Sequence, residues 1–521
     1  MEQKKIKIYL ILILILAFGF FLRVYNINNA PPGVYPDEAV NGQDALRTLD
    51  TGNFQWFYPD NQGREGLMMN LVALCFKLFG VSVLTLKLPA IVFGTLTILG
   101  VFLLTKELFK NNRIGLISAF LTAFSFIAIN FNRISFRANL LPFVLVFTFY
   151  FLFRGINTKK IYNYAIGGFI FGIGVHTYIA FRIAPLILFA LLVSFLLSRR
   201  HFLKEYWKPI VVFIVFSFIS AAPMIYTLFV SHPEYMESRS SSISILSPQV
   251  NQGHLLQTFF RSFGLSLIKY NFWGDQNWKH NYPPYPILDP ITGMAFLFGF
   301  LYSFFNLFKY LYLRFVKKHR AVELDKYTLL ISWFFAMLVP EFMTAEGNPH
   351  ALRSIGTLPV VFIFSAMTFE HFFKKAENSG IFFKKFTTFF LVFILIFIGL
   401  FNSVKYHYFW ANKLETALSF ENVLMDISRY IRNIPPQKEV FAVLGNMQRV
   451  PVRIFSWGRP GFHDLHPAEI DKINPPRSES FEVIFTDLEK EMIIKNLKQK
   501  FPNLNLYEYK DRFGTNYYVL K

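Results

Sequence analysis

The stretch Pro31-Pro32-Gly33-Val34-Tyr35-Pro36-Asp37-Glu38 follows closely on the first hydrophobic run of the sequence, Ile6 to Leu22. Its prolines and glycine predict a rigid turn, and two adjacent carboxylates end it. Burying a carboxylate in lipid is costly, so we expect Asp37 and Glu38 to be solvated or to line a cavity at the end of a membrane span. An acid held there can act as a general base. The alternative is that Asp37 is the N-cap of a helix that begins at Glu38.

The composition is that of a polytopic membrane protein. Of 521 residues, 53% are hydrophobic and 19% aromatic, which does not fit an ordinary soluble protein. The net charge is +20, but Lys and Arg occur mostly in short clusters between apolar runs. This placement indicates membrane topology and contact with anionic lipid headgroups, and it argues against nucleic acid as a partner. The one cysteine, Cys75, excludes a disulfide framework and a cysteine-based metal site.

The apolar runs predict about eleven membrane spans. The first run lacks a small-residue cleavage site, so we expect an uncleaved helix and not a signal peptide. Basic clusters fall in alternate loops, which the positive-inside rule assigns to the cytoplasm. We therefore expect a multi-pass protein of the plasma (inner) membrane, with a cytoplasmic N-terminus and an extracytoplasmic C-terminus. The predicted spans are 6–23, 86–108, 113–130, 139–155, 162–178, 183–198, 209–230, 290–313, 327–343, 354–372 and 386–403.

The remaining loops, which the same rule places outside the cell, carry most of the side chains that could bind a ligand or take part in catalysis. The first of them contains Gly63-Arg64-Glu65-Gly66 and then an apolar stretch, Leu67 to Phe79, which is too short to span and predicts a membrane-surface or re-entrant helix. The spans hold almost no ionisable residues, whereas their external ends hold many. Ion-coupled transporters usually place such residues near mid-membrane, so this pattern favours an enzyme that acts on a membrane-anchored substrate.

Four arginines lie at the external ends of predicted spans. Arg133 and Arg137 are four residues apart and would share a face if helical. Together with Arg182 and Arg353 they are suited to binding phosphate through paired hydrogen bonds. The alternative is that each arginine reaches lipid headgroups or pairs with a nearby acid. The positive-inside rule disfavours arginine on this side, so we favour phosphate binding.

After the last predicted span the composition becomes that of a soluble domain. We expect two domains, 1–403 in the membrane and 404–521 as a small extracytoplasmic α/β domain. The second domain shows no glycine-rich phosphate loop and no metal-binding spacing. Its predicted elements are a helix at 419–433, strands at 439–444, 450–457 and 481–486, a helix at 488–501, and a hairpin of 506–509 with 517–520.

The order of a basic N-terminus, a span, Pro-Pro-Gly-x-Tyr-x-Asp-Glu-Ala and then Gly-Arg-Glu before an apolar helix resembles the C-type (GT-C) glycosyltransferase superfamily. More closely, it is similar to bacterial members of the dolichyl-phosphate-mannose–protein mannosyltransferase family, which are relatives of the lipid A aminoarabinose transferases. The resemblance covers residues 1–403. It is supported by Arg133-Ile-Ser-Phe-Arg137, Tyr178-Ile-Ala-Phe-Arg182, Gly274-Asp275 to Asn281, Leu288-Asp289-Pro290 and Asn348-Pro349-His350-Ala351-Leu352-Arg353.

The resemblance implies a polytopic α-helical GT-C fold and transfer of a sugar, with inversion, from a polyprenyl-phosphate donor to an extracytoplasmic protein, lipid or glycan. It implies Asp37 as the catalytic base, with Glu38 assisting. The lipid A branch has an acidic metal ligand beside a Lys-Pro-Pro-Leu-like stretch. Here Arg64-Glu65-Gly66-Leu67 occupies the comparable place but departs from that pattern, because it lacks the Lys-Pro pair. The resemblance, and not this departure, gives Glu65 as the candidate ligand of a divalent metal. No other cofactor is expected.

The donor's leaving group is already an anion, so arginines can stabilise it while Asp37 takes the proton of the acceptor hydroxyl. A transporter or flippase for a lipid-linked sugar is the alternative function, and it would need the arginines but no carboxylate base. His280 and His350 are candidates for ligands, for proton shuttles or for polar residues that are simply hydrogen-bonded. Arg64 joins the four arginines as a candidate for the donor phosphate, and the candidates for sugar or acceptor binding are Glu65, Tyr178, Asp275, His280 and His350.

Overall fold

The computed structural model of the protein describes residues 2–60, 63–236, 244–474 and 481–521. The described chain forms two compact units. Unit 1 is Met1–Tyr25, Phe54–Met68 and Ala90–Tyr406, and unit 2 is Asn26–Asn53, Met69–Pro89 and His407–Lys521. Unit 2 thus combines two pieces of the predicted first external loop with the C-terminal residues.

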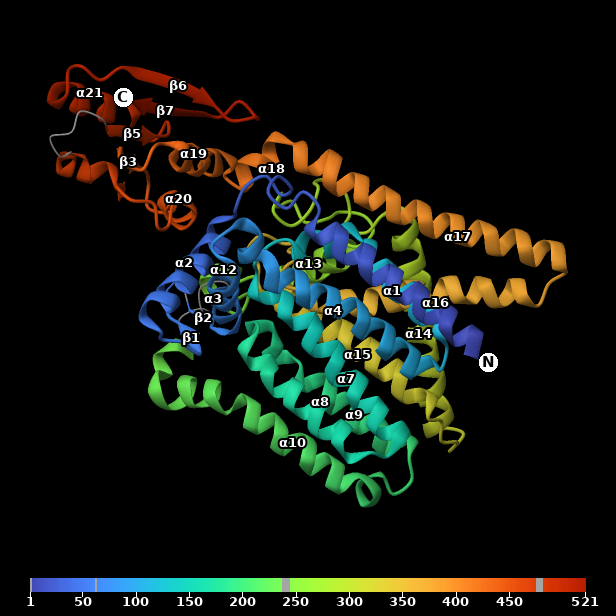
Figure 1. The fold of residues 1–521 in the computed structure, drawn as a ribbon. Helices are drawn as coiled ribbons and strands as arrows, with labels where there is room; N and C mark the ends of the chain where they lie inside the picture. The colour runs from blue at the N-terminus through green and yellow to red at the C-terminus, as the bar shows by residue number, and fades with distance from the viewer. Residues whose placement is uncertain (1, 61–62, 237–243, 475–480) are drawn as a thin grey trace. The chain divides into compact units, whose positions relative to one another are not determined.

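Helices dominate the chain up to residue 404 (Figure 1). The only strands before that residue, within the part of the chain described, are β1 (Phe57–Tyr58) and β2 (Arg64–Glu65), which pair in antiparallel fashion. The helices are α1 (Glu2–Val24), α2 (Pro36–Thr51), α3 (Leu67–Phe79), α4 (Val83–Phe109), α5 (Asn112–Phe124), α6 (Phe126–Asn132), α7 (Leu140–Thr158), α8 (Ile161–Ile173), α9 (Pro185–Ser198), α10 (Phe202–Tyr226), α12 (Pro248–Asn251), α13 (Leu255–Ile268), α14 (Pro290–Phe315), α15 (Glu323–Phe342), α16 (Leu358–Glu377) and α17 (Ile381–Val404).

Multi-pass membrane character is confirmed. Among the described residues, eight helices are long and apolar enough to cross a membrane. Helices α5 and α6 together are also long and apolar enough, but they bend by 60° at the break between them, as in a broken span or a re-entrant loop. The stretches predicted to span at 162–178 and 327–343 form α8 and α15, which are not among the helices long and apolar enough to cross a membrane. Helix α8 has only 13 residues, and α15 carries Glu323 and Asp325 in its first turn and Glu341 near its end.

Burial separates central from peripheral helices in unit 1. The apolar windows of the spans that contain α16 and α7 are 83% and 78% buried, whereas those of α1 and α10 are 17% buried. Exposed apolar side chains on α1 and α10 fit contact with lipid tails. Around α16 the core is aromatic: Phe300 of α14 packs against Phe334 of α15 and Phe364 of α16, at ring-centroid distances of 5.2 and 5.6 Å.

Glycines allow the closest helix contacts. A Cβ at Gly168 or Gly172 of α8 would lie 2.2 Å from the carbonyl oxygen of Phe213 or 2.0 Å from that of Ser217, both in α10. The spacing Gly168-x-x-x-Gly172 places both on one face of the helix, as in small-residue contacts between membrane helices. These glycines therefore let the backbones of α8 and α10 touch.

The C-terminal part of unit 2 is a five-stranded mixed sheet with strand order β4-β3-β5-β7-β6. Strand β3 is parallel to both β4 and β5, and β7 is antiparallel to β5 and β6. The elements are α18 (Leu414–Ser419), α19 (Asn422–Asn433), β3 (Glu439–Val443), α20 (Arg449–Phe455), β4 (Phe462–Leu465), β5 (Phe481–Phe485), α21 (Lys490–Lys500), β6 (Leu506–Lys510) and β7 (Asn516–Leu520).

Helices cover both faces of this sheet. Alternate residues of β3 point to opposite faces, so Val440 packs with Ile427 and Ile431 of α19, while Phe441 belongs to the core with Ile493 and Leu497 of α21. The small α/β fold predicted from the sequence is therefore confirmed. A strand such as β3, buried on both faces, reads as a continuous apolar run.

The predicted strand at 450–457 is wrong, because residues Arg449–Phe455 form α20. Alternating apolar residues suggested a strand, but β3 and β4 are parallel and need a crossover connection, which a helix supplies. The short strand β4, which follows this helix, was not predicted. The remaining predicted helices and strands of this region are confirmed within a few residues of their ends.

Within unit 2, the acidic stretch packs against the C-terminal residues. Helix α2 contacts α20, and a Cβ on Gly42 would lie 3.1 Å from the Ile454 side chain. The turn before α2 is tighter still. Gly33 has φ +118°, and a Cβ there would lie 2.3 Å from the carbonyl oxygen of Phe420. Only glycine fits this position without strain.

We expect Gly33→Ala to lower the stability of unit 2 by about 2 kcal/mol or more, because it adds left-handed strain and a backbone clash. Gly52→Ala is the matched control: Gly52 also has positive φ, +68°, but a Cβ there meets nothing within 4 Å. That control should cost only about 1–2 kcal/mol. Thermal unfolding of the purified proteins measures both changes, and equal effects would contradict the clash.

Candidate functional site

The acidic pair lies at the start of α2 in unit 2. Tyr35, with extended backbone angles, is the N-cap, and Pro36 is the first helical residue. The alternative that Asp37 is the N-cap is therefore wrong, because proline favours the first helical position and moves the cap back to Tyr35. Asp37 instead lies in the first turn, where the helix dipole stabilises its negative charge.

Tyr35 and Asp37 form a hydrogen-bonded pair. The hydroxyl of Tyr35 donates to Oδ2 of Asp37 over 3.0 Å, and Asp37 is half-buried. Burial and the charge of Asp37 raise the pKa of Tyr35, so the tyrosine stays protonated and donates to the carboxylate. Asp37 is thus held in one orientation while part of its surface stays open.

Glu38 is in a different environment. It is fully buried, as is Lys87 in the first turns of α4, and Nζ of Lys87 lies 3.8 Å from Oε2 of Glu38. The same ammonium group donates to the carbonyl of Gly33 over 3.4 Å. Of the two adjacent acids only Asp37 is accessible, so Glu38 is placed to fix the turn. An isolated lysine within an apolar run is the signal in the sequence that would have found Lys87.

Unit 1 brings Arg137, Glu65 and Tyr178 together. Nε of Arg137 lies 2.9 Å from Oε2 of Glu65, and both side chains are mostly buried. The guanidinium group also lies over the ring of Tyr178, 5.8 Å from its centroid. Glu65 comes from β2, and Arg137 opens the turn before α7. Sequence motifs that are far apart along the chain therefore form one charged cluster.

Three of the other arginines contact groups outside this cluster. Arg133 is fully buried and donates to the carbonyl of Leu22 over 2.6 Å. Arg64 donates to the carbonyl of Asp60 over 3.2 Å. Arg182 is exposed. Arg353 pairs with Glu346 at 3.0 Å.

Arg133 and Arg137 would share a face only in a continuous helix, and the chain does not form one there. Helix α6 ends at Asn132, and the chain turns before the 3-10 helix that Arg137 begins. The side chain of Asn139 stabilises this break, because its amide donates to the carbonyls of Phe131 and Ile134 over 2.6 and 2.8 Å. A side-chain amide that bonds backbone carbonyls replaces the hydrogen bonds that a longer helix would supply, so the helix can end here.

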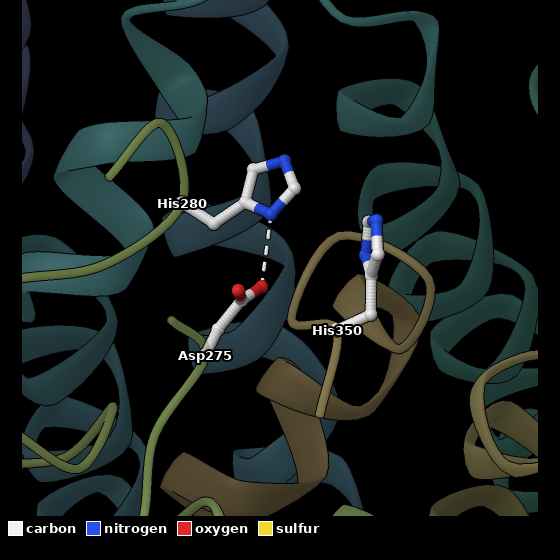
Figure 2. Close-up of side chains that lie close together, drawn as sticks. All are labelled: Asp275, His280 and His350. Carbon is white, nitrogen blue, oxygen red and sulfur yellow. Dashed lines mark hydrogen bonds and ion pairs between the residues drawn. The ribbon is translucent and has the colours of Figure 1, made fainter. Parts of the chain in front are cut away.

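A second cluster in unit 1 consists of Asp275, His280 and His350 (Figure 2). Oδ2 of Asp275 lies 2.9 Å from Nδ1 of His280 and accepts the N–H of Ala351 over 2.7 Å. The rings of the two histidines are 4.7 Å apart. His350 approaches from a separate loop, which follows α15.

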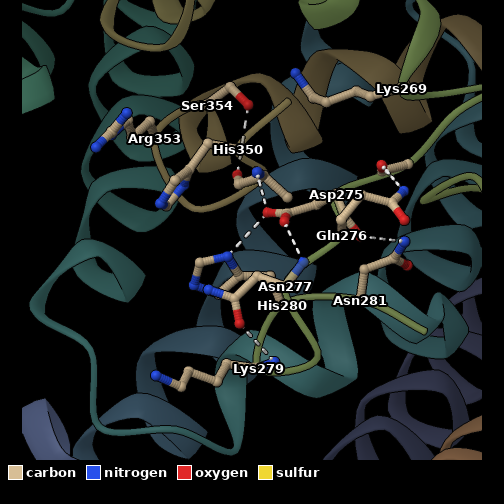
Figure 3. A network of polar contacts seen from close by, with 12 residues as sticks. Lys269, Asp275, Gln276, Asn277, Lys279, His280, Asn281, His350, Arg353 and Ser354 are labelled. Atoms are coloured by element: carbon tan, nitrogen blue, oxygen red, sulfur yellow. Dashed lines mark hydrogen bonds and ion pairs between the residues drawn. The ribbon is translucent and has the colours of Figure 1, made fainter. Parts of the chain in front are cut away.

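Further polar contacts fix both loops of this cluster (Figure 3). Oδ1 of Asp275 accepts the N–H of Asn277 over 2.8 Å, and Asn281 donates to the carbonyl of Asp275 over 3.1 Å. On the other side, Glu341 accepts the N–H of His350 over 3.0 Å and forms a fully buried ion pair with Lys269. The histidines are thus positioned by backbone bonds and a buried charge pair.

The electrostatics favour a carboxylate beside a neutral imidazole. Burial opposes ionisation of Asp275, but its electrostatic interactions with the two neighbouring imidazoles and the hydrogen bond from His280 outweigh it and hold the pKa of Asp275 below its usual value. Burial, with the charges of His280 and Arg353, lowers the pKa of His350 well below its usual value. His350 is therefore neutral at neutral pH.

This cluster fits a divalent metal ion. One aspartate and two histidines form a donor set that zinc uses, and their ligand atoms lie within 4.8 Å of one another. Nδ1 of His350 is buried and has no hydrogen-bond partner among the described residues. No other group of three such ligands occurs in the part of the chain that the structure describes. Glu65, the predicted metal ligand, pairs instead with Arg137, and its metal binding stays a prediction.

Comparisons with known proteins agree with this architecture. A family model described as dolichyl-phosphate-mannose-protein mannosyltransferase matches residues 67–226. The archaeal oligosaccharyltransferase AglB from Archaeoglobus fulgidus, solved with an inhibitory peptide and a dolichol-phosphate, matches with 15% identity and a TM-score of 0.54, covering 99% of this chain and 74% of that chain. The protein has the GT-C fold.

Two structures of ArnT from Cupriavidus metallidurans match over almost their whole length. The apo state has 10% identity and a TM-score of 0.53, covering 99% of this chain and 98% of that chain. The state bound to undecaprenyl phosphate has 11% identity and a TM-score of 0.53, covering 98% and 97%. No curated protein matches the sequence. The resemblance to GT-C enzymes seen in the sequence is therefore confirmed at the level of the fold.

We expect Lys269→Met to destabilise unit 1 by about 3–5 kcal/mol, because it leaves Glu341 charged and buried without its partner. The double variant Lys269→Met/Glu341→Gln should recover much of this loss. Glu323→Gln in the same helix is the control, since Glu323 is about half exposed and its ion pair with Lys326 should contribute about 1 kcal/mol or less. Thermal unfolding measures all three, and an unchanged Lys269→Met protein would show that the pair is unimportant.

Proposed function

We propose that this protein is a membrane glycosyltransferase that moves a hexosyl or pentosyl group from a polyprenyl-phosphate donor to an extracytoplasmic protein, lipid or glycan. The observation that carries the proposal is Asp37, a half-buried carboxylate that Tyr35 orients at a helix start, in a chain with the GT-C fold. Similar structures contain a dolichol-phosphate in AglB and undecaprenyl phosphate in ArnT, which supports a donor of this class.

Asp37 acts as the general base in this proposal. The acceptor hydroxyl loses its proton to Asp37 as its oxygen attacks the anomeric carbon, and the bond from that carbon to the lipid phosphate breaks. A single displacement of this kind inverts the configuration of the sugar. Tyr35 donates to Oδ2 of Asp37 and so orients the carboxylate, and the buried pair of Glu38 with Lys87 keeps the turn rigid.

Arg137 is the first candidate for the donor phosphate. A guanidinium group stabilises the phosphate as charge returns to it during bond cleavage. Glu65 and Tyr178 hold this guanidinium group between a carboxylate and a ring face. Arg182 and Arg353 remain candidates for the same anion. The contacts of Arg64 and Arg133 with backbone carbonyls support structural roles for these two residues.

The site is proposed to face outward from the plasma membrane, because the basic loops alternate with the loops that carry these residues. Asp275, His280 and His350 would hold a divalent metal ion, and its positive charge could stabilise anionic oxygens near it. These residues fit a metal better than Glu65 does, since Glu65 is paired with Arg137. The flippase alternative gains no support from the comparisons.

We expect Asp37→Asn to fold normally and to lose about two to four orders of magnitude in turnover, because the amide keeps the size of the side chain but not its basicity. The assay supplies polyprenyl-phosphate sugars that carry a radiolabel, with a membrane extract as the source of acceptor. Donor binding should be retained.

Asp50→Asn is the control for this variant, since Asp50 is an exposed aspartate of the same helix. It should transfer sugar at the wild-type rate. A folded Asp37→Asn protein with full activity would overturn the proposed role of Asp37. Movement of intact donor across liposomes without transfer would instead favour the flippase.

We expect Arg137→Ala to weaken donor binding by about one to two orders of magnitude, because charge-assisted hydrogen bonds contribute about 1.5–3 kcal/mol. Lysine should restore only part of the affinity, since it lacks the planar guanidinium fork. The double variant Arg137→Ala/Glu65→Gln tests the alternative that Arg137 serves only to neutralise Glu65. If the double variant regained wild-type donor affinity, Arg137 would not bind the phosphate.

A further inference from the structure

The sheet of unit 2 has a topological switch point at β3. From β3 the chain passes through α20 to β4 on one side, and later places β5 on the other side, with both neighbours parallel to β3. In open α/β sheets, ligands bind outside the carboxyl ends of the strands at such a point. The residues that follow β3 and β5 are therefore the place to look for a binding site.

A cavity of about 300 Å³ lies at this edge of the sheet. Gln448 follows β3, Asp487 follows β5, and Asn516 begins the antiparallel strand β7, and all three line the cavity. The topology alone predicts a site at this position, and the cavity agrees with that prediction.

The lining offers hydrogen-bonding groups of both kinds. Oε1 of Gln448 accepts from Thr486 over 3.3 Å, which leaves the amide NH₂ as a donor. Oδ1 of Asp487 accepts from the hydroxyl of Tyr518 over 2.8 Å, which leaves its second oxygen as an acceptor. Asn516 also lines the cavity, and its Nδ2 donates to the hydroxyl of Tyr518 over 3.3 Å.

The cavity lining is acidic, and its charge indicates which class of ligand can bind. Glu421, Asp487 and Asp511 supply carboxylates, and no lysine or arginine lines the cavity, which disfavours a phosphate or another anion. These carboxylates do not come close enough together to form a metal-binding group. The exposed side chains of Leu418 and Leu488 add apolar surface at the same cavity.

We propose that this cavity binds an uncharged saccharide. Its hydroxyl groups would donate to Asp487 and accept from Gln448, and the apolar face of the sugar ring would pack on Leu418 and Leu488. This saccharide site goes beyond the transfer reaction proposed for Asp37 and does not depend on it.

The test is saturation-transfer NMR on the purified full-length protein in detergent, with the methyl glycosides of glucose, galactose, mannose and N-acetylglucosamine as probes. We expect at least one glycoside to bind. Asp487→Asn, which keeps an acceptor for Tyr518, and Gln448→Ala should each weaken its affinity about tenfold. Asp471→Asn, at an exposed aspartate of the same unit that does not line the cavity, should leave the affinity unchanged.

Asp37→Asn separates this site from the transfer reaction, because it should lower turnover by about two to four orders of magnitude and leave glycoside binding intact. Glucose 1-phosphate is added as an anionic competitor. The proposal is overturned if no glycoside receives saturation or if glycoside binding survives both cavity variants. It is also overturned if glucose 1-phosphate binds and none of the glycosides does. Thermal unfolding of each variant shows that a lost signal does not reflect loss of folding.

Discussion

A helix that breaks inside a membrane protein must have its freed backbone groups satisfied by the protein itself, and unit 1 depends on this constraint. The bent helix pair of α5 and α6 leaves carbonyls near its break, and Arg23 of α1 donates to those of Thr122 and Ala123 over 3.4 and 3.0 Å. The same guanidinium group donates to Asn132, which in turn donates to Asn139. This chain of bonds fixes the turn after α6 and so determines where Arg137 begins its short helix beside Glu65.

Buried ion pairs fix the loops that carry the candidate site. Glu38 with Lys87 and Lys269 with Glu341 are fully buried, and taking such charges out of water offsets much of what their attraction contributes. The contacts of these ion pairs indicate that they position the backbone. Lys87 also bonds the Gly33 turn, and Glu341 also bonds the backbone of His350. In each unit, a fully buried ion pair thus holds the backbone beside a candidate functional residue, which is Asp37 in unit 2 and His350 in unit 1.

Periodicity and charge in the sequence predicted the helices well, because these signals are local. The apolar run from Leu67 to Phe79 forms a helix with those same ends, and the strands Glu439–Val443 and Phe481–Phe485 lie where their apolar runs predicted. Local signals failed where a distant partner decided the outcome. Residues 450–457 alternate like a strand, yet the parallel pairing of β3 and β4 requires a helix there.

The sequence by itself determined a multi-pass helical protein with a small α/β region and a carboxylate pair after the first span, since composition, hydropathy and turn residues act over short distances. Only the tertiary structure decided that Asp37 is accessible while Glu38 is buried, and that His350 joins Asp275 and His280. Those outcomes depend on loops that meet through backbone hydrogen bonds and buried charges, which no spacing along the chain encodes.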